Sequence, residues 1–359
     1  MNKNIKDFNN FNIEQLKSWV KEFHFFYKYD SSFYTKSNKQ YSLGNKTQRL
    51  CRYCGRDKSQ VTFKKNAHAI PKVIGNRFVK CFYECDSCNA IFGKYETDLS
   101  SFIGLRGYYE TPDKYGKKRV RIYKSKSGEG SLYFSKRGME LNDPKEEIFE
   151  IFDNDKILKS KAYKNPYIPL NVYKALLKMS VSVFKDESMK DLINTIKFLI
   201  TDEFDNNILI KKFAKLSCFF LTDFYIDNPI IFVFKKLSAI KEYEKKENIL
   251  IPDKTIIIFF RDFSYQIFIP LDKSDDFISK ETNNPVMLPL FPPMFANSKY
   301  TEYKLYPNYY HELKDLSSSE KIKDEKDEFI FISPIEPILL EYDNEEYEKI
   351  KLKYNLRDK

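Results

Sequence analysis

The stretch that decides the fold of the N-terminal part of this chain runs from Cys51-Arg-Tyr-Cys54 to Cys85-Asp-Ser-Cys88. Each Cys-x-x-Cys pair can bind a metal ion through two thiolates, and two such pairs complete a tetrahedral zinc site. One histidine, His68, lies between the pairs. We therefore expect a structural zinc ion that scaffolds a second, functional site around this histidine.

The composition of the whole chain fits an intracellular protein. Its 359 residues are 42% hydrophobic, which is enough for more than one domain with a buried core. Four of the six cysteines stand in the two metal-type pairs, which favours a reducing compartment over a secreted disulfide framework. The N-terminus has no apolar signal region, and no apolar run reaches the roughly 18 residues of a membrane span. We predict a soluble, cytoplasmic protein without membrane association.

The net charge of +10 is concentrated near the cysteine pairs. Residues 1–110 contain 19 Lys and Arg against 10 Asp and Glu, whereas the rest of the chain contains 42 against 41. A basic surface is what binding to a phosphate backbone requires, although a lysine-rich surface can also serve solubility alone. We expect DNA as the partner, without base-specific readout. The expected phosphate contacts are Lys64, Lys65, Lys72, Arg77, Lys80 and Arg106.

Residue patterns predict an α+β fold. In the cysteine module we expect a strand at 60–64, a strand or loop carrying His68, and a helix from Cys88 to Leu99. Periodicity and turn residues predict further elements: helices at 13–29, 170–184 and 189–201, hairpins within 119–134 and 255–270, and loops at 30–50 and 312–328.

These elements divide the chain into four segments. An N-terminal helix and arm (1–50) precede the cysteine module (51–110), a β-rich junction (111–160) and a larger mixed α+β domain (161–359). The C-terminal domain carries no motif, and we expect it to regulate or oligomerise the protein, with an activating ligand or partner protein as its binding partner.

Three residues in the module suit phosphodiester hydrolysis. The reaction needs a base that activates water and a cation that offsets developing charge. His68 is the natural base, because a neutral imidazole accepts a proton near neutral pH. Asn89 follows Cys88, and Glu96 lies two helical turns further on the same face, so both offer oxygen ligands to Mg²⁺ or Mn²⁺.

The module resembles the zinc-stapled HNH endonucleases of the His-Me finger (ββα-metal) superfamily. The resemblance covers residues 51 to about 107, through Cys-x-x-Cys, Ala-His-x-Ile-Pro-Lys, Gly-Asn, Glu-Cys-x-x-Cys-Asn, Phe-Gly and Tyr-Glu-x-Asp-Leu. It implies a ββα-metal fold in which the four cysteines hold structural zinc. It also implies that His68 is the general base and that Asn89 binds the catalytic metal. Enzymes of this architecture are often antiviral defence effectors, and we expect such a role here by analogy.

The module departs from the family pattern at two points. Many relatives have a metal-binding Asp or His directly before the base, where this chain has Ala67. The final histidine of the HNH motif is also absent. We therefore expect Asn66, Glu96 or Asp98 to complete the catalytic metal site, with Glu96 as the first choice.

Several alternatives stay open at this point. Asn89 can be a helix cap, Glu96 and Asp98 solvated helix residues, and Asn76 a loop or turn residue. Cys81 lies close enough to Cys85 to offer another register for the second pair. For the whole protein, the alternative is a catalytically silent zinc module that binds nucleic acid or a protein partner, and RNA is not excluded as the substrate of a nuclease.

Overall fold

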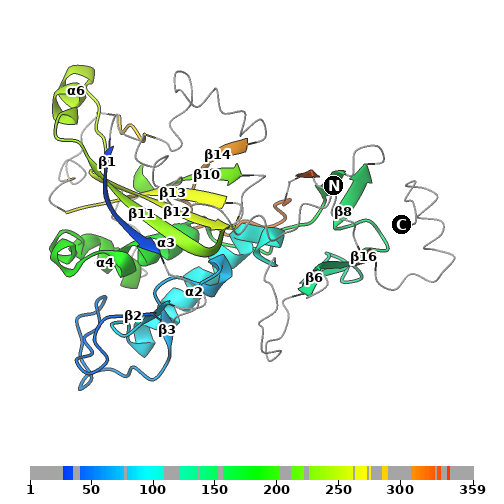
Figure 1. Ribbon diagram of the computed structural model, residues 1–359, viewed down its shortest axis with the longest axis horizontal. Coiled ribbons are helices and arrows are strands. Elements are labelled where there is room, and N and C mark those ends of the chain that lie inside the picture. Colours follow the sequence, from blue (N-terminus) through cyan, green and yellow to red (C-terminus); the bar gives the residue numbers. More distant parts are fainter. Residues whose placement is uncertain are drawn as a thin grey trace. The chain divides into compact units, whose positions relative to one another are not determined.

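The fold is α+β, as predicted, in a computed structural model (Figure 1). The structure describes residues 27–34, 41–76, 79–108, 122–135, 138–152, 157–201, 212–221, 226–261, 263–272, 275, 285–289, 309–327, 330–332 and 338–339. The chain forms two compact units: residues 1–96 with 169–319, and residues 97–168 with 320–359.

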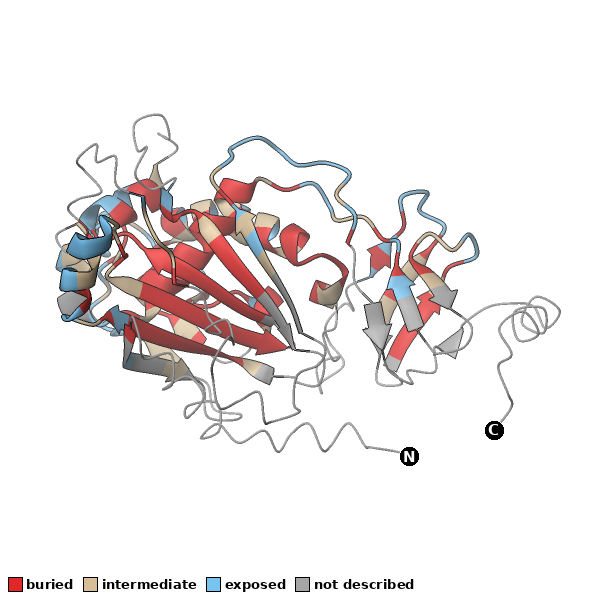
Figure 2. Ribbon diagram, turned by 90° about the horizontal axis from the view of Figure 1, so that it is seen from above, coloured by how far each residue is buried: buried red, intermediate tan, exposed pale blue. Residues whose placement is uncertain are grey.

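The first unit is built on an antiparallel sheet of six strands in the order β1-β11-β12-β13-β10-β14. The strands are β1 (Tyr27–Tyr34), β11 (Ile226–Lys236), β12 (Lys254–Arg261), β13 (Phe263–Ile269), β10 (Lys215–Leu221) and β14 (Tyr309–Asp315). The central strand β12 is rich in isoleucine and phenylalanine and is buried along almost its whole length (Figure 2). Such residues suit a strand that is covered on both faces.

Helices α3 (Pro169–Val183) and α4 (Ile193–Ile200) pack along one face of this sheet (Figure 1). Tyr173 of α3 donates a hydrogen bond to the carbonyl of Phe268 on β13, at 3.1 Å. Thr195 of α4 donates to the carbonyl of Pro270, at 2.7 Å. The short helix η4 (Asp186–Asp191) joins α3 to α4, and α6 (Ile240–Glu247) joins β11 to β12.

The cysteine module belongs to the same unit as far as Glu96. Strands β2 (Tyr41–Leu43), β4 (Val79–Cys81) and β3 (Ala67–His68) form a small sheet in that order, and the short helix η2 (Lys72–Ile74) lies between β3 and β4. Helix α2 (Asp86–Ile103) follows the sheet. Its buried residues recur every three or four positions, which is the pattern of an amphipathic helix. The repeating series is Cys88, Phe92, Tyr95, Leu99 and Phe102, and Ser101 and Ile103 beside its end are also buried.

The second unit begins with the end of α2 and the short helix η3 (Gly104–Tyr108). One sheet has the order β16-β7-β6-β5, and another has the order β15-β9-β8. Their strands are β5 (Tyr123–Lys124), β6 (Ser131–Ser135), β7 (Gly138–Asn142), β8 (Phe149–Phe152), β9 (Ile157–Ser160), β15 (Ile330–Ile332) and β16 (Ile338–Leu339). A small apolar core around Leu132 and Phe149 holds the unit together.

Several predicted elements are confirmed. The helix expected from Cys88 begins two residues earlier, and α3 matches the helix expected at 170–184. The helix expected at 189–201 is confirmed from Ile193, where α4 begins, while its first residues belong to η4. Strands β5 and β6 form the first predicted hairpin, and β12 and β13 form the second. Among the described residues, no helix is long and apolar enough to cross a membrane.

Other predictions were wrong, and each error involves a strand. Residues 60–64 form no strand; the main-chain N–H groups of Lys64 and Lys65 bond instead to the side chain of Asp86. The loop expected at 30–50 contains the end of β1 and all of β2, and the loop expected at 312–328 begins inside β14. Of the helix expected at 13–29, residues 13–26 lie outside the described residues, and 27–29 belong to β1.

Candidate functional site

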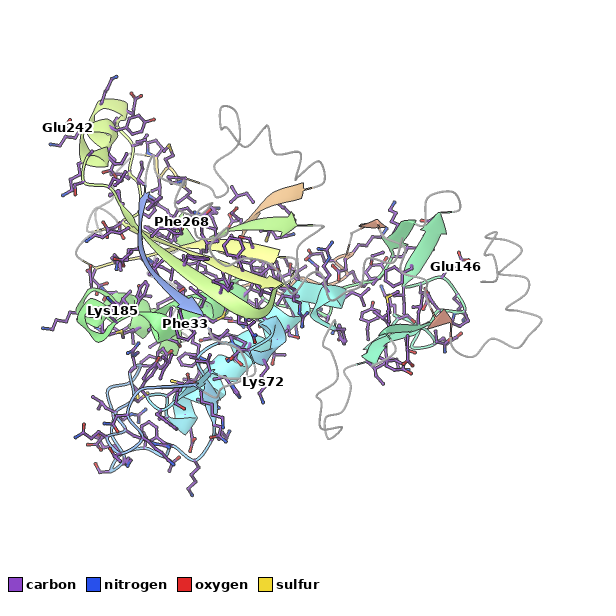
Figure 3. All side chains as sticks on the ribbon, in the orientation of Figure 1. Phe33, Lys72, Glu146, Lys185, Glu242 and Phe268 are labelled. Carbon is purple, nitrogen blue, oxygen red and sulfur yellow. The ribbon has the colours of Figure 1, made fainter. Side chains whose placement is uncertain are left out.

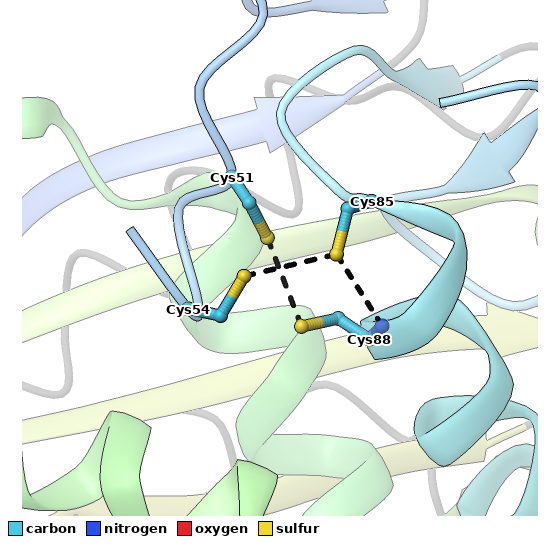
Figure 4. A group of neighbouring side chains, drawn as sticks. All are labelled: Cys51, Cys54, Cys85 and Cys88. Carbon is cyan, nitrogen blue, oxygen red and sulfur yellow. Dashed lines mark hydrogen bonds between the residues drawn. The ribbon is translucent and has the colours of Figure 1, made fainter. Parts of the chain in front are cut away.

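The four cysteines of the two pairs form one cluster (Figure 4). Their sulfur atoms all lie within 4.8 Å of one another, with 3.7 Å between Cys51 and Cys88 and 3.7 Å between Cys54 and Cys85. A tetrahedron of thiolates around Zn²⁺, with bonds of about 2.3 Å, has sulfur–sulfur edges of about 3.8 Å. The cluster therefore has the size that a zinc ion requires.

The cluster also decides which cysteines belong together. Cys81 is buried on β4 and Cys218 is buried on β10, and neither belongs to the metal-type cluster. Burial raises the pKa of the Cys81 thiol to about 12, which makes it a poor ligand. The register that pairs Cys85 with Cys88 is therefore the one that the fold adopts.

Mutual contact and burial shift the pKa values of Cys51, Cys85 and Cys88. The hydrogen bond between Cys51 and Cys88 lowers the pKa of Cys51 to about 4 and raises the pKa of Cys88 far above its usual value. Burial raises the pKa of Cys85 to about 11. A divalent cation would balance the negative charge of several thiolates at once, so that neighbouring thiolates would no longer disfavour one another.

Asp86 ties the loop between the pairs to the first turn of α2. Its carboxylate accepts hydrogen bonds from the hydroxyl of Thr62 and from the main-chain N–H groups of Lys64 (3.0 Å) and Lys65 (2.8 Å). A carboxylate at a helix N-terminus is also stabilised by the helix dipole. The segment that leads into His68 is thus held by the residue that follows Cys85.

His68 ends strand β3, opposite Lys80 on β4. Its side chain is half-buried, and within the described residues no group forms a hydrogen bond with its buried Nδ1. Burial is the main cause that lowers the pKa of His68 to about 4, and the positive charge of Lys72 adds to the effect. The imidazole is therefore neutral at physiological pH.

Asn76 holds the turn between β3 and β4. The buried amide nitrogen donates hydrogen bonds to the carbonyls of Ile70 (2.6 Å) and Val79 (3.0 Å), and the amide oxygen accepts one from the N–H of Val79 (2.8 Å). The sequence left Asn76 as either a loop or a turn residue. Its hydrogen bonds close the loop that connects His68 to β4.

The expected oxygen ligands of the catalytic metal have different surroundings. Asn66 is exposed just before β3, and Asn89 is half-buried on α2. Among the described residues, neither side chain makes a hydrogen bond. Glu96, two turns further along α2, is 30% exposed in its side chain and forms an ion pair with Lys178 at 3.3 Å. Asp98 is half-buried on the same helix.

Lys178 on α3 connects Glu96 to His68, and the sequence did not single it out. Its ammonium donates a hydrogen bond to the main-chain carbonyl of His68 and lies 3.2 Å from Glu84 Oε2. Burial alone would lower the pKa of Lys178, but Glu84 and Glu96 together raise it. Burial raises the pKa of Glu84 to about 7, against the opposing effect of Lys178. The sequence feature that could have pointed to Lys178 is the presence of a lysine within a largely apolar helix.

The expected phosphate contacts differ in exposure. Lys64 and Lys65 are exposed, as is Lys72 on η2 (Figure 3), and Lys80 is half-buried. Arg77 lies outside the described residues, and Arg106 is half-buried on η3, in the second unit. The described cations near His68 are therefore lysines of the first unit.

Comparisons with known proteins add no relative. No protein-family model, no curated protein and no solved structure matches this chain.

Proposed function

We propose that this protein is a metal-dependent endonuclease of the HNH type that hydrolyses DNA phosphodiester bonds, with His68 as general base. One observation carries the proposal: a ββα-like segment, β3-β4-α2, joins a neutral, half-buried histidine to a four-cysteine cluster. The zinc that fits this cluster would hold the start of α2 against the loop of the first pair, and so fix the frame around the base.

The charge around His68 supports a phosphate substrate. Lys72 and Lys80 are among the groups that lower its pKa, so a phosphodiester bound beside them would cancel part of that effect. The pKa of His68 would then rise toward the range that suits a general base. In the reaction, the imidazole would take a proton from water while the water oxygen attacks phosphorus and the bond to the leaving oxygen breaks.

The residues on α2 also fit a hard divalent cation. Among the described residues, the cysteines form the only cluster of three or more potential His, Cys, Asp or Glu ligands. A Mg²⁺ or Mn²⁺ ion would therefore have few protein carboxylates; we propose Glu96 as the carboxylate, with Asn89, Asn66 and substrate oxygens to complete the coordination. Mg²⁺ is commonly held by one or two carboxylates with water and phosphate. When bound, the ion would offset charge that develops on the phosphate.

Plasmid nicking tests the proposal. Purified wild-type protein is compared with His68→Ala, with Mg²⁺, Mn²⁺ or EDTA, and zinc content is measured in each sample. His311→Ala, on β14 of the six-stranded sheet, is the matched control. We expect the wild type and the control to nick DNA only when Mg²⁺ or Mn²⁺ is present. Zinc-loaded His68→Ala should not nick DNA under any condition. Parallel single-stranded and duplex RNA substrates decide between DNA and RNA.

A second candidate function is a catalytically silent zinc module that binds nucleic acid or a protein partner. Two observations favour it: Ala67 is a buried methyl group next to His68, and Glu96 is already paired with Lys178. Binding of DNA without nicking under any metal condition would support this candidate. Activity lost only in His68→Ala would exclude it.

A further inference from the structure

The ammonium of Lys178 is surrounded by oxygen atoms from three parts of the cysteine module. Its side chain is 1% exposed, and it lies 3.2 Å from Glu84 Oε2 and 3.3 Å from Glu96 Oε1. It also donates to the main-chain carbonyl of His68. These oxygens come from the end of β3, from the residue before Cys85 and from the middle of α2. One charge on α3 thus reaches both the candidate base and the candidate metal ligand.

Packing alone does not account for this lysine. Replacing a buried ion pair by apolar groups of similar volume often costs nothing in stability, so the pair of Lys178 with Glu84 is weak evidence for a purely stabilising role. Glu84 is fully buried and would suffice to pair with it, yet the ammonium also contacts Glu96, which is partly exposed. Within the described residues, Lys178 is the only hydrogen-bond or ion-pair partner of Glu96, and it engages Oε1.

We propose that Lys178 is a positioning residue of the nuclease site, whose ammonium fixes the main chain of His68 and the carboxylate of Glu96 relative to each other. The inference rests on the proposed function and extends it, because it makes helix α3, which packs on the six-stranded sheet, part of the site. With Oε1 held by Lys178, Oε2 of Glu96 would be the oxygen that could bind a divalent cation. Displacing such a group by about 1 Å can reduce a rate on the order of 100-fold.

The same helix offers a matched control. Lys174 lies one turn before Lys178, is also buried, and donates to the carbonyl of Thr201 at 3.0 Å and to the hydroxyl of Tyr95 at 3.4 Å. Its described partners include neither His68 nor Glu96. Replacing it removes a buried ammonium from α3 without removing either contact at the site.

The experiment compares full-length wild type, Lys178→Met/Glu84→Gln and Lys174→Met. The double variant removes both charges of the fully buried pair, so that the only carboxylate left without its partner is that of Glu96, which is partly exposed. Each protein is labelled with carbonyl-¹³C histidine, which gives one signal for each of three histidines, and His68→Ala assigns the signal of His68. Zinc content, and kcat and KM for plasmid nicking with Mg²⁺, are measured on the same samples.

We expect the double variant to retain zinc, its His68 carbonyl signal to move upfield through loss of the hydrogen bond, and kcat to fall on the order of 100-fold at unchanged KM. Lys174→Met should change neither the signal nor kcat. An unmoved His68 signal, or an unchanged kcat, would overturn the proposal.

Two further outcomes keep this proposal separate from the nuclease proposal. If wild type does not nick DNA, the nuclease proposal fails, while the carbonyl signal still decides whether Lys178 holds His68. If the double variant loses zinc, Lys178→Arg carries the same two readouts, because it keeps the charge but displaces the donor atom.

Discussion

Arg52 donates a hydrogen bond from Nη1 to the main-chain carbonyl of Phe184, 2.9 Å away. Arg52 stands inside the first cysteine pair, and Phe184 directly follows helix α3. The same nitrogen also donates to the carbonyls of Val181 (3.0 Å) and Ser182 (3.3 Å). Carbonyls at a helix C-terminus lack partners within the helix and carry partial negative charge. One side chain therefore joins the loop of the first cysteine pair to the helix that carries Lys178.

The first prediction concerns this contact. Arg52→Met should lower the free energy of unfolding by about 1.5–3 kcal/mol, the range for hydrogen bonds made by a charged group. Urea unfolding of the zinc-loaded protein measures this change in the free energy of unfolding. Lys185→Met is the control, because Lys185 is an exposed positive charge at the same helix end. A loss of equal size in the control would mean that charge near the helix end, and not the bonds of Arg52, stabilises the contact.

The second prediction concerns the metal. The purified protein should contain one zinc ion per chain, because four sulfur atoms form a single cluster. Cys88→Ser should lose the ion and unfold the module, since zinc binding contributes about 10–16 kcal/mol in small structural sites. Elemental analysis by mass spectrometry measures the content. Cys81→Ser should keep the full amount, and its loss in that variant would contradict the pairing of Cys85 with Cys88.

The third prediction concerns the protonation of His68. Because burial and Lys72 lower its pKa to about 4, its ring signals in NMR should stay at their neutral position from pH 8 to pH 6. Between about pH 6.5 and about pH 4, the unfolded state binds more protons at His68 than the native state does. His68 therefore reduces the free energy of unfolding as the pH falls from about 6.5 to about 4. A titration midpoint near 6.5 in the folded protein would show that the ring is solvated.

The fourth prediction concerns Asp275, which is buried beside the six-stranded sheet and accepts hydrogen bonds from the N–H groups of Asp253 and Leu271. Burial raises its pKa to about 7. Between about pH 4 and pH 7 the native state therefore holds more protons than the unfolded state, so this group lowers stability as the pH rises.

Thermal or urea unfolding from pH 5 to pH 8 tests this sign. The free energy of unfolding of Asp275→Asn should fall less steeply with pH than that of the wild type, since the amide does not ionise. Asp272→Asn, whose carboxylate is only half-buried, should keep the slope of the wild type. Parallel slopes for wild type and Asp275→Asn would refute the expected ionisation.

Local patterns predicted much of the fold. The spacing of apolar residues in α2 and α3, and the two apolar runs of the β12–β13 hairpin, depend on neighbours a few positions away, so sequence alone identifies them. Strand β1 depends on β11, about 200 positions further along the chain. Because its hydrogen-bond partners are distant, residues 27–29 resembled the end of a helix. Residues 60–64 have strand-like side chains but no partner strand among the described residues.

In the candidate site, too, local patterns were readable from the sequence and distant contacts were not. The sequence by itself identified the four clustered cysteines, because two residues between ligands suit a chelating geometry within each pair. It also pointed to His68, the one histidine between them. Only the tertiary structure decided that Lys178, 110 positions away, bonds to the main chain of His68 and pairs with Glu96. A buried charge finds its counter-charges through the packing of α3 on the module, and no local pattern records that packing.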